Sequence, residues 1–179
     1  MKRLTFKIAA EPSEFQQIYW LNYRTFVEEI PRYESSTPGR LVDRFDKENA
    51  YIISLRGTQV LGMLAVRGKR PFSLDERLGN LGAYLPPGRS VCEIRLLAVE
   101  RKHRNGPVFY GLVMRLAQYC KERGYDLAVV SGVVQQQKLY EHLGFVPFGY
   151  RVGTPDALFQ PMYMTLETFK ERAKSWRRS

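Results

Sequence analysis

The sequence has few of the residues that build metal centres or covalent frameworks. Cys92 and Cys120 are its only cysteines, and His103 and His142 are its only histidines. Two cysteines cannot form a disulfide framework, and none of these residues stands at the spacing typical of metal ligands. We therefore expect buried free thiols at both cysteines and no metal site.

Long apolar runs are also missing. No stretch approaches the ~20 apolar residues that a membrane-spanning helix needs. The N-terminal segment MKRLTFKIAAEPSEF lacks the apolar core of a signal peptide. These absences predict a cytoplasmic protein without a membrane span.

Acidic residues are in the minority. The chain has 28 Lys and Arg against 18 Asp and Glu, a net charge of +10. Such a charge suits nucleic acid, small molecules that bear phosphate, or an acidic protein. Nucleic acid is the less favoured partner, because no nucleic-acid motif is present and the basic residues do not fall on one predicted helix.

The length of 179 residues suits one domain. No repeat or long linker divides the chain, so we predict a single domain over residues 1–169. The last ten residues, 170–179, contain five basic residues and one acidic residue. We expect them to form a basic C-terminal tail or the end of a helix.

The apolar pattern predicts alternating strands and helices. Ser13 is the expected N-cap of the first helix, and Pro31 is expected to end it. Two long irregular segments are expected at 33–49 and 68–89, the second rich in glycine and proline. Strands joined by helices predict an α/β or α+β domain around a mixed sheet. We expect strands at 4–9, 51–55, 60–66, 90–99, 127–132, 145–150 and 159–166, and helices at 13–30, 107–123 and 135–144.

Three segments occur in an informative order. A strand and a basic turn that opens a helix (CEIRLLAVERKHRNGPVFYGLVMRLA) are followed by LAVVSG and by QKLYEHLGFVPFG. This series resembles the GNAT acyltransferase superfamily, and LYEHLGF is similar to that superfamily's LYEKLGF-type segment. The resemblance implies a mixed, mostly antiparallel sheet flanked by helices, with a splayed parallel strand pair that holds the acyl donor.

The basic turn is the expected donor site. A helix N-terminus presents unpaired N–H groups to phosphate oxygens, and the resemblance implies that this turn binds the pyrophosphate of acetyl-CoA or another acyl-CoA. The implied donor-binding residues are Leu97, Ala98, Val99, Arg101, Lys102, Arg104, Asn105, Gly106 and Val108.

The turn departs from the family pattern R/Q-x-x-G-x-G/A. Aligned on Arg104, both expected glycines are replaced, one by Pro107 and the other by Phe109. Proline has no N–H to donate, so we expect a weaker hold on a pyrophosphate. The arm of an acyl-carrier protein has one phosphate and would be affected less.

A second resemblance is to acyl-homoserine lactone synthases and N-acyl amino acid synthases. The series consists of a phenylalanine on the first helix, a D-x-x-D segment, RPFSLDERL, and a strand with Glu93 and Arg95. Asn22 stands where the helix arginine of those enzymes falls, and E-x-R replaces E-x-x-R. The substrate-binding residues that the resemblance implies are Phe26, Asp43, Asp46, Arg67, Arg70, Phe72 and Arg95.

Two residues are candidates for the chemistry. Tyr140 matches the GNAT tyrosine near the thioester sulfur, which implies a general acid. Strand alternation places Glu93 on one face with Arg95, Leu97 and Val99. Glu93 is either a general base or a structural or substrate-binding partner of Arg95.

The leading hypothesis is a GNAT-type N-acyltransferase. It moves an acyl group, first of all acetyl, from acyl-CoA to a small-molecule or peptide amine by direct attack. The alternatives are an N-acyl amino acid or signal-lipid synthase that uses acyl-carrier protein, an inactive GNAT-like ligand-binding module, and a basic nucleic-acid-binding protein. The oligomeric state does not follow from the sequence.

Overall fold

The computed structural model describes residues 3–176. In chain order its elements are β1 (Leu4–Ile8), α1 (Pro12–Tyr23), the π-helix η1 (Arg24–Glu29), β2 (Ala50–Arg56), β3 (Gln59–Arg67), α2 (Ser73–Leu78), the 3₁₀ helix η2 (Leu81–Tyr84), β4 (Val91–Val99), the 3₁₀ helix η3 (Arg101–His103), α3 (Pro107–Arg123), β5 (Leu127–Val133), the 3₁₀ helix η4 (Val134–Gln136), α4 (Gln137–Leu143), β6 (Val146–Pro147), β7 (Val152–Thr154), β8 (Ala157–Thr165) and α5 (Leu166–Trp176).

Within the described range the strands form a mixed, eight-stranded sheet. Its order is β1-β2-β3-β4-β5-β8-β6, and β7 pairs with β8. β4 and β5 are parallel, whereas β1–β2, β2–β3, β5–β8, β6–β8 and β7–β8 are antiparallel. The predicted α/β class with a mostly antiparallel sheet is therefore confirmed.

The chain divides into two compact units. The first comprises Met1–Arg67 and Arg95–Gln118, and the second comprises Gly68–Ile94 and Tyr119–Ser179. The single domain over 1–169 stays a prediction. Of the predicted basic tail, residues 177–179 lie outside the described residues.

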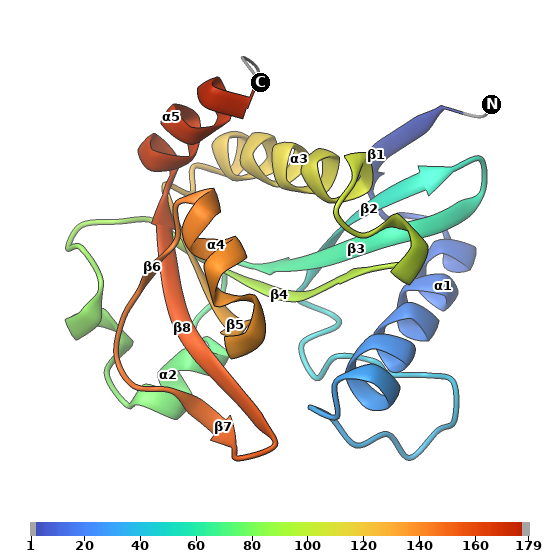
Figure 1. Ribbon diagram of the computed structural model, residues 1–179, viewed down its shortest axis with the longest axis horizontal. Helices are drawn as coiled ribbons and strands as arrows, with labels where there is room; N and C mark the ends of the chain where they lie inside the picture. Colours follow the sequence, from blue (N-terminus) through green and yellow to red (C-terminus); the bar gives the residue numbers. More distant parts are fainter. Residues whose placement is uncertain (1–2, 177–179) are drawn as a thin grey trace. The chain divides into compact units, whose positions relative to one another are not determined.

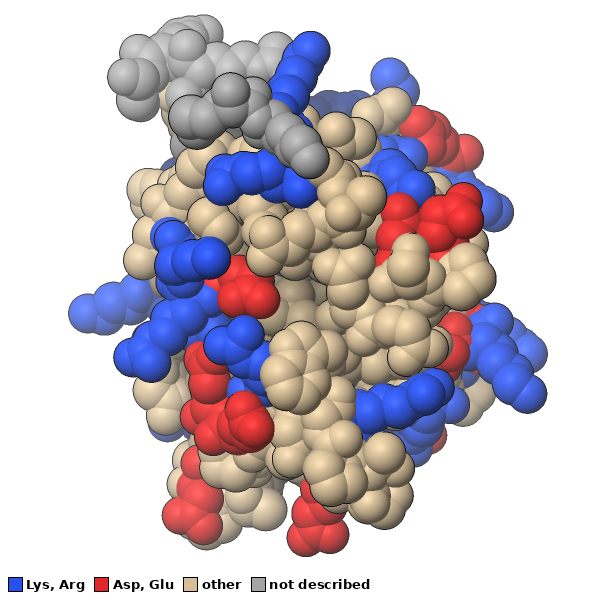
Figure 2. All heavy atoms as spheres, turned by 90° about the vertical axis from the view of Figure 1, so that its right-hand side faces the viewer, with Lys and Arg blue, Asp and Glu red and all other residues tan. Residues whose placement is uncertain are grey.

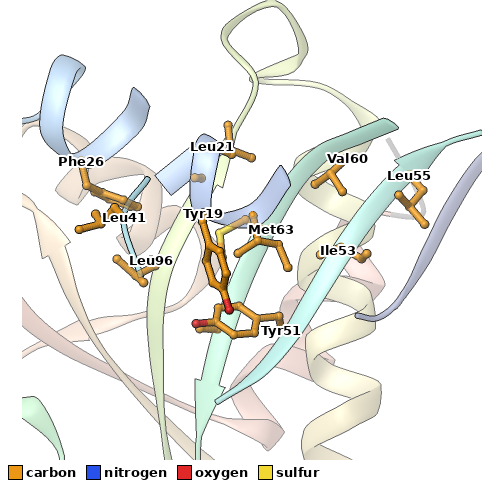
Figure 3. Packing of buried hydrophobic residues seen from close by; sticks show 13 residues of the cluster. Tyr19, Leu21, Phe26, Leu41, Tyr51, Ile53, Leu55, Val60, Met63 and Leu96 are labelled. Atoms are coloured by element: carbon orange, nitrogen blue, oxygen red, sulfur yellow. The ribbon is translucent and has the colours of Figure 1, made fainter. Parts of the chain in front are cut away.

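In the first unit, one core lies between α1 and the strands β2 and β3. Alternate residues of the two paired strands, such as Ile53 opposite Met63, face the helix. Figure 3 shows Tyr19 and Leu21 of α1 over these strands, with Phe26 and Leu96 in the same cluster.

The opposite face of β3 is covered by α3 (Figure 1). A Cβ at Gly62 would lie 2.9 Å from Val108 Cγ1 and 3.0 Å from Leu112 Cδ1. A side chain at this position would therefore separate the helix from the strand. Because both faces are covered, almost every residue of β2 and β3 is buried.

The second unit has its own core. Phe72 and Leu74 of the α2 region pack with residues of β5 and β8, among them Val129 and Phe159. All four side chains are almost fully buried. The core therefore fixes the start of α2 against the sheet strands of its own unit.

Several predicted boundaries were wrong in detail. The first helix begins at Pro12 with Glu11 as its N-cap, not Ser13, because the Glu14 carboxylate accepts hydrogen bonds from the N–H groups of Ala10 (2.9 Å) and Glu11 (3.1 Å). The predicted four-residue hairpin connection is a two-residue turn at 57–58.

The segment 68–89, predicted to be irregular, contains α2 and η2, and β7 was not predicted. By contrast, α3 has the predicted bounds. Cys92 and Cys120 are free and buried, as expected. No helix within residues 3–176 combines the length and apolar content that crossing a membrane requires.

Candidate active site

A charged cluster in the first unit is built on residues 43–49, here named the acidic loop. The Asp43 carboxylate accepts two hydrogen bonds of 2.8 Å from the Nε and Nη2 groups of Arg95. Both side chains are almost fully buried, at 2% and 5% exposure. A third bond of 2.7 Å comes from the Asn49 amide. Asp43 and Arg95 therefore form a buried bidentate ion pair between the acidic loop and β4.

The ion pair with Arg95 changes the pKa of Asp43. Burial alone would raise that pKa, but the hydrogen bonds and the positive charge of Arg95 outweigh burial and lower the pKa below its ordinary value of 3.8. The Asp43 carboxylate is therefore ionised at neutral pH and paired with the Arg95 guanidinium.

An aromatic ring links two of the predicted arginines. Phe45 lies with its ring centre 3.7 Å from the Arg67 guanidinium carbon and 4.9 Å from that of Arg95. Arg67 is buried and donates to Glu48 at 2.8 Å through Nε, with Nη2 at 2.7 Å. The acidic loop thus balances the charge of both buried arginines.

Asp46 is held differently, by two tyrosine hydroxyls. Tyr51 donates to its Oδ1 at 2.6 Å and Tyr19 donates to its Oδ2 at 3.0 Å. Figure 3 shows the two tyrosines side by side, reaching down from α1 and across from β2. Burial and the bond to Asp46 raise the pKa of Tyr19 to about 12, and burial also raises the pKa of Tyr51. Both hydroxyls therefore remain protonated donors at neutral pH.

β4 contains an irregularity that the alternation argument missed. Leu96 has a φ of 53°, in the left-handed region that a leucine rarely adopts. Leu96 belongs to the α1-side core, and its neighbour Arg95 bonds to the acidic loop. The predicted common face of Glu93, Arg95, Leu97 and Val99 is therefore interrupted after Arg95, because the left-handed φ of Leu96 breaks the regular alternation of a strand.

The basic turn lies between β4 and α3. The Arg104 side chain already has two partners in the first unit. Its Nε donates to the Val99 carbonyl at 2.9 Å, and its Nη2 pairs with Glu29 at 2.8 Å. Asn105 adopts a left-handed φ of 59°, and Pro107 begins the helix. Arg101 and Lys102 are exposed beside the turn.

The other predicted donor-binding residues lie on β4, in the basic turn and at the start of α3. Ala98, Val99 and Val108 are buried, whereas Leu97 and Gly106 are partly exposed. The parallel pair predicted to hold the donor is present, with Val91–Ile94 of β4 in register with Leu127–Val130 of β5. Donor binding by these residues stays a prediction.

Tyr140 lies on α4 in the second unit. A Cβ at Gly132 of β5 would lie 3.1 Å from Tyr140 Cδ2, so the ring rests against the strand backbone. The ring also meets Phe145 edge-on, with centroids 5.6 Å apart. Its half-buried side chain is therefore held by packing on two sides.

Glu93, Arg70 and Phe72 also lie in the second unit. Glu93 accepts hydrogen bonds from Ser73 and Leu74 at the start of α2. Arg70 is exposed and pairs with Asp75, whereas Phe72 is buried.

The structure thus brings together Asp43, Asp46, Arg67 and Arg95 in the first unit. Sequence reasoning missed the residues that connect them, which are Tyr19, Phe45, Glu48, Asn49 and Tyr51. Phe45 stands inside the D-x-x-D segment and Glu48 two residues after it, and this proximity is the signal that would have found them. Among the described residues, no group of His, Cys, Asp and Glu is arranged to hold a metal ion.

Solved structures of three acyltransferases have the same fold as this chain. The solved structure of the acyl-homoserine lactone synthase LasI is 17% identical with a TM-score of 0.77, covering 93% of this chain and 91% of that one. FeeM, an N-acyl amino acid synthase from uncultured soil microbes, is 14% identical with a TM-score of 0.75 over 95% and 94%. A putative N-acetyltransferase from Lactobacillus plantarum is 17% identical with a TM-score of 0.66 over 91% and 98%. The chain therefore has a GNAT-like acyltransferase fold.

The family follows from the sequence itself. A family model described as N-acyl amino acid synthase FeeM matches residues 17–166. No significant match was found among curated proteins. The chain belongs to the N-acyl amino acid synthase FeeM family and is an acyltransferase enzyme, as the sequence predicted.

Basic and acidic side chains are mixed on one face of the molecule (Figure 2). On the face shown in Figure 2, Lys and Arg side chains lie among Asp and Glu side chains instead of forming one stripe. A basic stripe is the usual mark of a nucleic-acid interface.

Proposed function

We propose that this enzyme joins an acyl group to the amine of an amino acid, as an N-acyl amino acid synthase. The observation that carries the proposal is the family match over residues 17–166. The acidic loop supports it, because the D-x-x-D carboxylates and Arg95 that prompted the sequence resemblance form one connected cluster.

The proposed donor is an acyl thioester on a phosphopantetheine arm. The arm's amides would pair with the backbone at Leu97, Ala98 and Val99, and its phosphate would meet the N-terminus of α3. Arg101 and Lys102 are exposed beside that turn and supply positive charge.

Acyl-carrier protein is the favoured donor. Arg104 already bonds to Val99 and Glu29, and Pro107 removes one N–H from the helix N-terminus. A turn with these losses is better matched to the single phosphate of a carrier arm than to a pyrophosphate. Acetyl-CoA remains the alternative donor.

The proposed acceptor is an α-amino acid. Asp43 and Arg95 neutralise each other in the buried pair, so we assign them to holding the acidic loop in place. Asp46 is only partly buried and accepts from two tyrosines without a cationic partner among its described hydrogen bonds. Its carboxylate suits the acceptor's ammonium group. Arg70 is exposed and is proposed to contact the substrate. Phe26, Arg67 and Phe72 are buried, so we propose that each supports the substrate-binding residues of its own unit from beneath.

The proposed chemistry is direct transfer. The acceptor's ammonium group first gives one proton to solvent water. The resulting uncharged amine nitrogen attacks the thioester carbonyl carbon, the C–N bond forms and the C–S bond breaks. Tyr140 gives its hydroxyl proton to the leaving sulfur and regains a proton, through water, from the newly formed amide nitrogen. Atoms and charge balance without a covalent enzyme intermediate.

A donor and acceptor panel tests the proposal. Purified enzyme is incubated with myristoyl-carrier protein, myristoyl-CoA or acetyl-CoA and the proteinogenic amino acids, and products are measured by mass spectrometry. We expect an N-acyl amino acid to form fastest from the carrier protein. Acetyl transfer to a polyamine or peptide, with no reaction on amino acids, would overturn the proposal.

A further inference from the structure

The carboxylate of Glu93 lies within a closely packed hydrogen-bond arrangement in the second unit. It is 2% exposed. Oε2 accepts from the Ser73 N–H at 3.1 Å, and Oε1 accepts from the Leu74 N–H at 3.3 Å and from the Ser73 hydroxyl. Both oxygens are therefore occupied by donors from the start of α2.

These bonds complete the N-terminus of α2. The Phe72 N–H donates to Asp75 at 2.7 Å, and Asp75 pairs with Arg70. Together the two carboxylates accept from three successive N–H groups, which a helix leaves without intrahelical partners. A six-residue helix is too short to persist alone, so its position depends on such outside partners and on its buried side chains.

The same segment carries two of the predicted substrate-binding residues. Phe72 is fully buried in the core of the second unit, and Arg70 stays exposed next to it. Glu93 reaches this segment from β4, twenty positions along the chain. A change at Glu93 is therefore transmitted to residues 70–75 through Ser73.

The geometry points to Glu93 as a positioning residue, which holds the 70–75 segment through Ser73 for acceptor binding and does not act as the general base. This inference rests on the proposed N-acyl transfer to an amino acid. A base must turn a free lone pair toward the substrate's proton, whereas the Glu93 oxygens are directed at the backbone of α2. The sequence-based alternative was a structural or substrate-binding pair of Glu93 with Arg95. In the structure the described ion pair of Arg95 is with Asp43, and the described hydrogen bonds of Glu93 come from Ser73 and Leu74.

Paired substitutions test the inference. Ser73→Ala removes the hydroxyl, Glu93→Gln places an N–H₂ group against an N–H donor, and the double variant combines both. Asp156→Asn, at an exposed carboxylate of the same unit, is the control. If Glu93 acts through Ser73, each single variant raises KM for the amino acid by about 10- to 100-fold. The KM of the double variant is then no higher than that of the more impaired single variant, because the two residues act as a unit.

The pH profile separates positioning from proton transfer. If Glu93 positions the 70–75 segment, the acidic limb of the kcat/KM profile persists in Glu93→Gln. Ser73→Thr, which keeps the hydroxyl group, then retains most of the activity that Ser73→Ala loses. Loss of that limb in Glu93→Gln, with a ~100-fold or larger fall in kcat and normal kinetics in Ser73→Ala, would overturn the inference.

Hydrogen exchange supplies a readout that needs no substrate. The amides of Ser73 and Leu74 should exchange at least ~10-fold faster in Glu93→Gln than in the wild type or in Asp156→Asn. Unchanged exchange would refute the anchoring role even if the enzyme makes N-acyl amino acids. Faster exchange in a protein that makes no such product would instead refute the proposed function.

Discussion

The buried pair of Asp43 and Arg95 gives the sharpest stability prediction. Asp43→Ala leaves the Arg95 guanidinium buried beside Phe45 and removes both of its 2.8 Å bonds to the carboxylate. Breaking a buried pair by removing one partner costs about 3–5 kcal/mol. An exposed ion pair contributes only about 0–1 kcal/mol. Since a protein of this size is stable by roughly 5–15 kcal/mol, the variant should unfold at a much lower urea concentration.

The assay is urea unfolding followed by circular dichroism, with the exposed Asp156→Ala as control. A second comparison, Asp43→Leu with Arg95→Met, should recover most of the lost stability, because an apolar pair of similar volume replaces the charges. A cost below ~1 kcal/mol for Asp43→Ala would refute the burial of this ion pair.

Four further predictions follow from named contacts. The pKa of Asp43 is lowered in the folded state, so its contribution to stability is complete above about pH 4 and is lost as the pH falls through the folded pKa; acid unfolding of Asp43→Asn should lack this component, and an identical acid transition would contradict it. Gly62→Ala places a Cβ 2.9 Å from Val108 and should cost about 1–3 kcal/mol, measured by thermal unfolding, whereas an unchanged melting temperature would disprove the close contact. Pro107→Gly restores an N–H at the start of α3 and should tighten CoA binding in calorimetry; unchanged affinity would mean that this turn does not bind the phosphates. Tyr140→Phe should lower kcat by a factor on the order of 10–1000 while donor binding stays near normal, and wild-type turnover would remove Tyr140 from the mechanism.

Much of the fold could be predicted from local pattern. α3 has an apolar face at helical spacing between a proline and a glycine, and its bounds match the prediction. The strands β2 to β5 are apolar runs bounded by polar turns, so their existence was also predictable.

The missed features depend on distant partners. α2 stands in a glycine- and proline-rich segment, and its N-terminus is satisfied by Glu93 on another element. The left-handed φ of Leu96 occurs at a residue that is not glycine, so no residue type in the sequence indicates it. The π-helix η1 likewise follows α1 without a break in the apolar pattern.

The charged residues of the candidate site could be predicted from the sequence, but their hydrogen-bond partners could not. Asp43, Asp46 and Arg95 were recognised from a motif. That Arg95 bonds to Asp43, while Asp46 bonds to two tyrosines, depends on how the acidic loop folds back on β2 and β4. Pattern alone carries no information on such pairing.

The proposed reaction forms an amide bond between an acyl group and an amino acid. The most direct measurement is nuclear magnetic resonance of the product from a carrier protein loaded with an acyl group labelled at its carbonyl carbon and an amino acid labelled at its amine nitrogen. A one-bond coupling between the two labelled atoms, together with release of the carrier thiol, is the predicted result. Thiol release that yields only the free fatty acid, or consumption of neither substrate, would contradict the claim.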